Sequence, residues 1–347
     1  MIGAEDLGMT YPIIQAPMAG VTTPAFVAAS AEAGLLGSIG AGYLSADETR
    51  NFIREVKSLT DKPFAVNLFV PQQVEMDQET LRTAYTALQP IGEKLGLPFW
   101  KVSLSESQFE KQVWVLIEEG VKVCSFTFGL PTKETTQLLS DHGIVLIGTA
   151  TTVEEAMLVE QARMDAVVMQ GSEAGGHRGT ISGEMTGTPL HELLEEVRET
   201  VQIPIIAAGG IADKDMLKKA LSAGAQAVQI GTALLAADES GAHPIYKEAV
   251  LHAKEDSTVI TNAFSGKPAR GIRNQFIEDM EGIPIAPYPY QNDLTKRLRK
   301  EAAAQGKPEY MSLWAGEKVH LTKGGTVKEI VERFIDKEAG FSQYPFL

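Results

Sequence analysis

The segment from 171 to 180, GSEAGGHRGT, places a carboxylate, four glycines, a histidine and an arginine directly after an apolar run, DAVVMQ. Gly175 and Gly176 precede His177, and Gly179 follows it two residues later. Glycines at these positions let the backbone approach a ligand closely and let the imidazole point inward. An imidazole held in this way can act as a base, as an acid or as a hydrogen-bond donor to an anion. We therefore predict that His177 is the catalytic residue.

The charged neighbours of His177 are expected to have supporting roles. Glu173 can accept hydrogen bonds from backbone N–H groups and so orient the loop, which we favour over a role as a base. Arg178 points away from His177 if the loop is extended, which indicates the surface or a phosphate. The remaining histidines are interpreted as ordinary loop or helix-end residues; they are His142, His191, His243, His252 and His320.

Two further glycine turns follow apolar runs later in the chain. Gly209 and Gly210 come after IPIIAA and are expected to open a helix, while Gly231 and Thr232 come after AVQI. Such turns expose backbone N–H groups at helix N-termini, and barrel enzymes use them to hold a terminal phosphate. Either turn alone would indicate only a tight connection, but two in the last two units indicate a phosphate site.

The ends of three other apolar runs carry residues suited to a flat, hydrogen-bonding heterocycle. QAPM supplies Ala16, Pro17 and Met18, VNLFVP supplies Asn67, and VVMQG supplies Gln170. Each side-chain amide offers a donor and an acceptor, which matches the mixed edge of an isoalloxazine ring or a ribityl chain. Because an amide is costly to bury unpaired, both amides are expected to have partners.

These residues need elements that bring them to one edge of the fold. Eight apolar, β-branched runs alternate with segments of helical periodicity, which is typical of parallel βαβ units. Such strands are covered on both faces, so we predict an α/β fold, a closed (β/α)8 TIM barrel, with an open doubly wound sheet as the alternative. Working groups in these barrels stand at the carboxyl ends of the strands. The predicted strands are 12–18, 36–42, 64–70, 121–129, 143–150, 165–171, 203–210 and 225–235.

The chain is predicted to divide into a barrel and a smaller cap. Residues 1–239 are assigned to the barrel, although 71–104 is overlong for a connection and indicates a helical excursion. Residues 240–320 carry Pro, Gly and aromatic clusters and are predicted to form a C-terminal cap over the barrel mouth and the substrate. Residues 321–347 are expected to supply a final helix and a tail that pack back on the barrel.

Composition narrows the classes of protein. Of the 347 residues 44% are hydrophobic, yet no apolar stretch reaches about 18 residues and the start lacks a signal-peptide pattern, so no membrane partner is expected. A formal net charge of −14 disfavours nucleic acid, and the basic run KRLRKEAAAQGK is interpreted as a solvated helix face. The single Cys124 lies in an apolar run and favours a reducing cytoplasm. No histidine and carboxylate pattern has metal-ligand spacing, so no metal is predicted.

Five segments in order along the chain resemble one known family. They are YPIIQAPMAGVTTP, KPFAVNLFVP, QGSEAGGHRG, IPIIAAGGI and AVQIGTALL, and together they resemble the nitronate monooxygenases, formerly called 2-nitropropane dioxygenases. The resemblance runs from residue 11 to about 235 and includes PYPYQND and WAGE further on. EAGGHRG is its most specific part.

The resemblance implies a (β/α)8 barrel with a second domain, bound FMN, and oxidation of alkyl nitronates, with nitroalkanes as further substrates, by O2 to a carbonyl compound and nitrite. It implies that His177 is catalytic. We expect the protein to be a monomer or a homodimer. The FMN-contacting residues that the resemblance implies, together with those inferred above, are Ala16, Pro17, Met18, Asn67, Gln170, Gly175, Gly176, Gly209, Gly210, Gln229, Ile230, Gly231 and Thr232.

Three other functions remain open from the residues. A flavin-dependent enoyl-acyl-carrier-protein reductase or quinone reductase would use NAD(P)H and the same glycine-flanked histidine, although an acidic chain is poorly suited to an acidic carrier protein. A phosphate-binding lyase or isomerase without redox chemistry would place Lys, Asp or Glu at several strand ends, where this chain has Met, Asn, Gln and Gly. A flavin carrier without catalytic activity is the last alternative.

Overall fold

Eight parallel strands form the centre of the molecule. The structure is a computed structural model and describes residues 7–72, 74, 77–181 and 187–335. The strand order is β1-β9-β8-β6-β5-β4-β3-β2, and a parallel bridge between Ile14 and Leu36 joins the two outer strands, so the predicted (β/α)8 barrel is confirmed. The barrel strands are β1 (Ile13–Gln15), β2 (Gly37–Gly40), β3 (Phe64–Phe69), β4 (Val123–Thr127), β5 (Val145–Ala150), β6 (Ala166–Gln170), β8 (Ile205–Ala208) and β9 (Ala227–Ile230).

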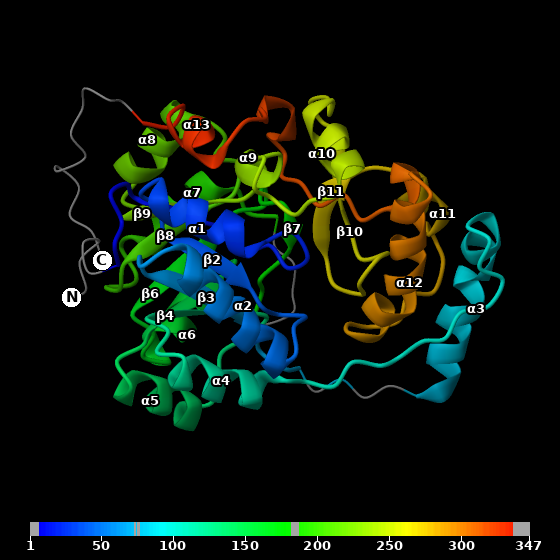
Figure 1. Cartoon of the computed structure of the whole chain (residues 1–347), viewed down its shortest axis with the longest axis horizontal. Helices are drawn as coiled ribbons and strands as arrows, with labels where there is room; N and C mark the ends of the chain where they lie inside the picture. Colours follow the sequence, from blue (N-terminus) through cyan, green and yellow to red (C-terminus); the bar gives the residue numbers. More distant parts are fainter. Residues whose placement is uncertain (1–6, 73, 75–76, 182–186, 336–347) are drawn as a thin grey trace.

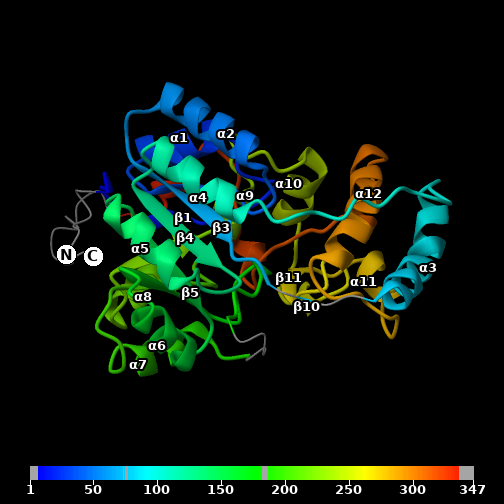
Figure 2. The ribbon, with the colours of Figure 1, turned by 90° about the horizontal axis from the view of Figure 1, so that it is seen from below.

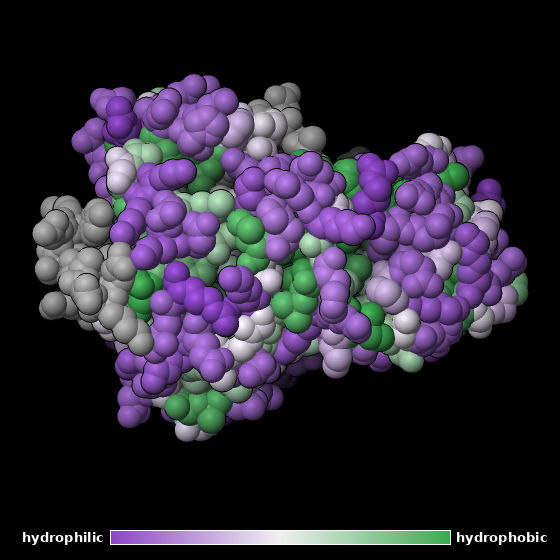
Figure 3. Space-filling model, turned by 90° about the horizontal axis from the view of Figure 1, so that it is seen from above, coloured by the Kyte–Doolittle hydropathy of each residue, from purple (hydrophilic) through white to green (hydrophobic). Residues whose placement is uncertain are grey.

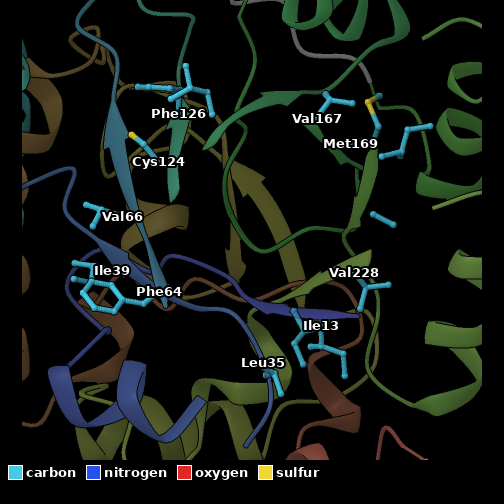
Figure 4. Packing of buried hydrophobic residues seen from close by; sticks show 14 of the residues in the cluster. Ile13, Leu35, Ile39, Phe64, Val66, Cys124, Phe126, Val167, Met169 and Val228 are labelled. Atoms are coloured by element: carbon cyan, nitrogen blue, oxygen red, sulfur yellow. The ribbon is translucent and has the colours of Figure 1, made fainter. Parts of the chain in front are cut away.

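Alternation along the strands explains why both barrel faces are apolar. Ile13 packs in the cluster that includes the helices, whereas its neighbour Ile14 packs in a second cluster that contains no helix residue. In the same way, Val167 packs in the first cluster and Val168 in the second. Successive side chains of a strand point to opposite faces, so the second cluster is the barrel interior. Figure 4 shows part of the first cluster, including Val167 and Cys124, which is buried in β4 as expected.

Helices surround the barrel, and several of them begin or end at recognisable capping residues. Thr23 caps α1 with Pro24 at the first helical position, and Ser45 and Glu48 form a capping box on α2. Gly34 and Gly143 follow α1 and α5 with positive φ, as predicted. These helices are α1 (Pro24–Glu32), α2 (Ala46–Leu59), α4 (Phe109–Glu118), α5 (Lys133–Asp141), α6 (Val153–Gln161), α7 (Leu190–Val197), α8 (Lys214–Ser222), α9 (Thr232–Leu235) and α13 (Val327–Val331).

The cap, meaning residues 240–320, lies beside the barrel (Figure 1). It contains a second hydrophobic core. The cap sheet pairs β10 with β11, and β11 in turn pairs with β7, a short strand that carries His177. The elements here are β7 (Gly176–His177), α10 (Pro244–Leu251), β10 (Thr258–Thr261), β11 (Ala269–Ile272), α11 (Gln275–Asp279), α12 (Tyr290–Ala304) and the 3-10 turns η1 (Pro308–Tyr310) and η2 (Val319–Leu321).

The helical excursion predicted for 71–104 is present as α3 (Gln78–Lys94), and it lies against the cap. Leu88 and Ile91 belong to the cap core, and Trp100 donates a hydrogen bond from Nε1 to the Leu294 carbonyl of α12 at 3.0 Å. Figures 1 and 2 both show α3 beside α12, at the far end of the molecule from the barrel. The cap core therefore draws on two separate parts of the chain, while the predicted domain boundaries stay a prediction.

The end of the chain returns to the barrel. Val327 and Ile330 of α13 pack in the barrel cluster together with the helices. The tail predicted beyond this helix lies partly outside the described residues.

The surface seen from above is mostly hydrophilic, with hydrophobic residues in separate patches (Figure 3). In the described part of the chain, no helix is long and apolar enough to span a membrane. The basic run 296–307 is a solvated face at Lys296, Arg297 and Lys300, but the prediction is wrong for Arg299. Its guanidinium turns inward and donates to the Asn292 carbonyl and side chain at 3.0 and 2.8 Å, because this position faces the cap core.

Candidate active site

A cavity lies at the carboxyl ends of the barrel strands, where the barrel meets the cap. Its wall includes residues that directly follow β1, β8 and β9 and residues from the cap such as Tyr246 and Trp314. This is the position at which barrel enzymes bind their ligands. Every residue that sequence analysis assigned to the site lines this cavity: Ala16, Pro17, Met18, Asn67, Gln170, Gly175, Gly176, His177, Gly209, Gly210, Gln229, Ile230, Gly231 and Thr232.

Sequence analysis missed the aromatic residues around His177. The Phe128 ring lies 5.6 Å from the imidazole, between ring centroids, and Trp314 and Tyr288 lie 5.4 and 6.4 Å from it. Phe128 has a positive φ of 73°, which is rare for a bulky residue and is associated with functional sites. Phe128 directly follows the end of β4, so the strand-end rule could have identified it. Trp314 and Tyr288 come from the cap and carry no such signal.

His177 is held by the cap as well as by the barrel. Its strand β7 pairs with β11 in the register Ala269 to His177, and its Nε2 lies 2.8 Å from the Ser265 hydroxyl. Burial, together with the nearby positive charges of Arg299 and Lys267, lowers the pKa of His177 to about 3. The imidazole is therefore neutral at ordinary pH.

Arg178 corrects one expectation. Its side chain is buried, not at the surface or at a phosphate: Nη1 donates to the Gly171 carbonyl and Nη2 to the Gln170 carbonyl at 2.9 Å. The guanidinium satisfies two carbonyls at the end of β6, where the chain leaves the ladder. Arg178 thus ties the end of β6 to the loop that carries His177.

Glu173 and Gln170 hold the loop that carries His177 through hydrogen bonds. Glu173 accepts a hydrogen bond from the Leu190 amide at 3.0 Å, which agrees with the expected orienting role. Gln170 donates to the His177 carbonyl at 3.1 Å and accepts from the Gly179 amide at 2.8 Å. The loop geometry is therefore set by hydrogen bonds on both sides of His177.

Two amide side chains keep hydrogen-bonding capacity for a ligand. Asn67 donates to the Ser125 and Thr127 hydroxyls at 3.0 and 3.1 Å, while its oxygen accepts no hydrogen bond from the described residues. Gln229 lines the cavity, and its side chain forms no hydrogen bond within the described part of the chain. Together they offer two acceptors and one donor group to a heterocycle.

Three backbone amides next to the cavity are also without partners. The N–H groups of Gly209, Gly210 and Gly231 form no hydrogen bond with any residue that the structure describes. Gly209 and Gly210 have φ of 117° and 68°, a conformation that L residues rarely adopt. They precede α8 by several residues instead of opening it, as had been expected, because Asp213 caps that helix. Free amides that line one cavity can bind an anion, so the residues present fit a phosphate.

Two cationic side chains approach His177 from the cap. Lys267 is 7% exposed, and its Nζ lies 4.8 Å from the centroid of the Phe128 ring. Burial lowers the pKa of both Lys267 and Arg299. In the described residues, Arg299 Nε has no hydrogen-bond partner. The field at His177 is therefore positive, which favours an anionic ligand there.

No group of three or more His, Cys, Asp or Glu residues in the described ranges could hold a metal ion. The barrel, the glycine turns and the histidine at its mouth define the class as a (β/α)8-barrel enzyme with a candidate site at the carboxyl ends of the strands.

Comparison with known proteins then gives the family. A sequence model of the nitronate monooxygenase family matches residues 4–337, so the chain belongs to that family, which is one of flavin-dependent oxidoreductases. A probable nitronate monooxygenase from Staphylococcus haemolyticus is 43% identical over 96% of this chain and 95% of its own length.

Two solved structures agree with this placement. The nitroalkane oxidase of Streptomyces ansochromogenes is 38% identical, with a TM-score of 0.89 over 98% of this chain and 97% of that one. FabK of Thermotoga maritima is 32% identical, with a TM-score of 0.75 over 94% of this chain and 92% of that one.

Proposed function

We propose that the protein oxidises alkyl nitronates with bound FMN and O2, and gives a carbonyl compound and nitrite. The observation that carries the proposal is the pairing, in one cavity, of three free backbone amides with a neutral histidine in a positive field. The amides suit the FMN phosphate, and the field suits a nitronate anion. Family membership and the likeness to a nitroalkane oxidase support the same reading.

Separate groups of residues in the cavity would bind the cofactor, act on the substrate and exclude water. The amides of Gly209, Gly210 and Gly231 would hold the phosphate, and Asn67 and Gln229 would pair with the polar edge of the ring system. When bound, FMN supplies the two-electron chemistry and the reaction with O2. His177 would orient the nitro group, or take the α-proton of a neutral nitroalkane. Phe128, Tyr288 and Trp314 would exclude water from the reacting atoms.

Arg299 and Lys267 would hold the nitronate by charge. Neither forms an ion pair with a carboxylate within 4.0 Å in the described ranges, although Asp293 acts to raise the pKa of Arg299 and Glu155 that of Lys267. A single buried Cys124 supports, in addition, our proposal of a cytoplasmic enzyme. A monomer or homodimer stays a prediction.

Product analysis tests the proposal. The FMN-loaded protein is given propyl-2-nitronate in air, and O2 consumption, nitrite and acetone are followed together. We expect nitrite and acetone in equal amounts. FMN-loaded protein that consumes no O2 and releases no nitrite would refute the proposed activity.

A further inference from the structure

Among the described residues, Ser265 is the hydrogen-bonding partner of the His177 imidazole. Its hydroxyl lies 2.8 Å from Nε2 of His177, 3.1 Å from the carbonyl oxygen of Lys267 and 3.3 Å from the Lys267 amide. Ser265 is 1% exposed, so its one proton must go to an acceptor inside the protein. The acceptors in reach are the Lys267 carbonyl and the imidazole.

Counting hydrogen bonds distinguishes the two arrangements. If Ser265 donates to Lys267, then His177 Nε2 carries a proton and donates it to Ser265, and all three groups are satisfied. If Ser265 donates to Nε2 instead, the Lys267 carbonyl loses the donor that the structure gives it, and the proton must move to Nδ1. In either arrangement Nδ1 faces the cavity without a partner among the described residues, so the second arrangement differs in leaving the Lys267 carbonyl without its donor. The first arrangement is therefore favoured.

Nδ1 is the free edge of the ring. His177 lines the cavity, and Nδ1 is not among the buried atoms that lack a partner, so it is open to the cavity. The rings of Phe128, Tyr288 and Trp314 surround the imidazole and restrict its rotation. The charged groups that face it are Arg299 and Lys267, both cations, which can neither accept a proton from Nδ1 nor replace Ser265 as an acceptor.

We propose that Ser265 is a positioning residue that fixes His177 as the Nε2–H tautomer and presents the Nδ1 lone pair to the cavity. The catalytic consequence rests on the proposed function: Nδ1 takes the α-proton of a neutral nitroalkane. The C–H bond breaks, its electron pair moves into the nitro group to form the nitronate anion, and the proton forms the Nδ1–H bond of an imidazolium, whose positive charge the nitronate balances. A preformed nitronate needs no such step.

Nitrogen NMR of the histidine-labelled protein, as purified, tests the tautomer without any substrate. His177 is assigned from the spectrum of the His177→Asn variant. We expect pure Nε2–H in the unmodified protein and in Ser265→Thr, which keeps a hydroxyl, and a mixture of both tautomers in Ser265→Ala. The matched control is Ser240→Ala, another buried serine, whose hydroxyl accepts only from the Ala242 amide in the described structure. It should leave the His177 signals unchanged.

The spectrum can overturn the proposal in two ways. A spectrum of the unmodified protein that shows Nδ1–H would refute the assigned tautomer. This test does not depend on the folding of any variant. Pure Nε2–H in a folded Ser265→Ala would show that Ser265 does not fix it.

Kinetics tests the consequence. With nitroethane as substrate, Ser265→Ala should lower kcat on the order of 10²-fold, as expected for loss of a correctly oriented base. With preformed ethyl nitronate the change should stay within about threefold, since no proton is removed. An equal loss with both substrates would refute the base role of Nδ1. A protein that oxidises neither compound refutes the proposed function, and the spectrum alone then decides the tautomer.

Discussion

His177 is a neutral imidazole near two cations, an environment that suits the binding of an anion; as a base it would become a cation, whose charge the nitronate anion formed beside it would balance. Burial is the largest cause of its lowered pKa, and Arg299 and Lys267 add to it. A histidine that served as a permanent cation would need a neighbouring carboxylate, and none lies within ion-pair distance of it in the described residues. The role of His177 is therefore orientation and proton transfer.

Replacing this imidazole should separate catalysis from cofactor binding. His177→Asn keeps a polar side chain of similar reach but removes the base, so kcat for nitroethane should fall by at least about 10²-fold. FMN content should stay unchanged, because the free amides that suit its phosphate lie on other loops. The measurement is nitrite release together with flavin absorbance. His142→Asn, at the exposed end of α5, is the control. Full activity in His177→Asn would refute the catalytic assignment.

The pKa of His177 also predicts how stability depends on pH. The unfolded chain takes up a proton near pH 6.5, whereas the folded chain does so only near pH 3, so folding loses stability as pH falls through this window. Between pH 7 and 5, the unfolding free energy should fall by about 2 kcal/mol more in the unmodified protein than in His177→Asn. Urea unfolding at one fixed FMN concentration measures it. Parallel pH dependences would contradict the lowered pKa.

At the scale of elements, the turn after β8 is the part that joins the barrel to the cofactor. Gly210→Asp places a carboxylate beside the free amides and a Cβ at 3.1 Å from that of Glu173, with φ of 68°. FMN affinity should fall by at least about tenfold through charge repulsion and lost approach. Equilibrium dialysis of FMN measures it.

Gly143→Asp is the matched control, since Gly143 has the same φ of 68°, open space around its Cβ and a position before β5, at the opposite end of the barrel. Equal FMN affinity in the two variants would show that the phosphate is held elsewhere.

The elements of the barrel could be predicted because their signals are local. Val167 and Val168 belong to an apolar run, and Gly210 follows such a run, so strand and turn are visible in a few residues. The contact of Ser265 with His177 spans 88 positions and leaves no periodic signal. The direction of Arg178 was wrong because it depends on which carbonyls β6 leaves unpaired. No short sequence pattern predicts tertiary contacts of this kind.

At the scale of the whole molecule, the cap core includes residues of the segment 71–104, which lies between two barrel strands in the sequence. The stability of the cap should therefore depend on this segment. Trp100→Ala removes a side chain that is 8% exposed and bonded to α12, so the unfolding free energy should fall by about 3 to 5 kcal/mol. Trp114→Ala, on α4 with 52% exposure, should change it by less than about 1 kcal/mol. Urea unfolding followed by circular dichroism compares them. Equal effects would mean that the segment 71–104, through Trp100, does not stabilise the cap.

The central proposal for the whole molecule is that flavin bound in the cavity between the barrel and the cap takes electrons from a nitronate. The direct test is anaerobic mixing of the FMN-loaded protein with propyl-2-nitronate and, separately, with NADH and with NADPH, while the flavin spectrum is recorded. We predict rapid bleaching by the nitronate and none by either nicotinamide. Bleaching by a nicotinamide alone would contradict the account and identify the protein as a reductase.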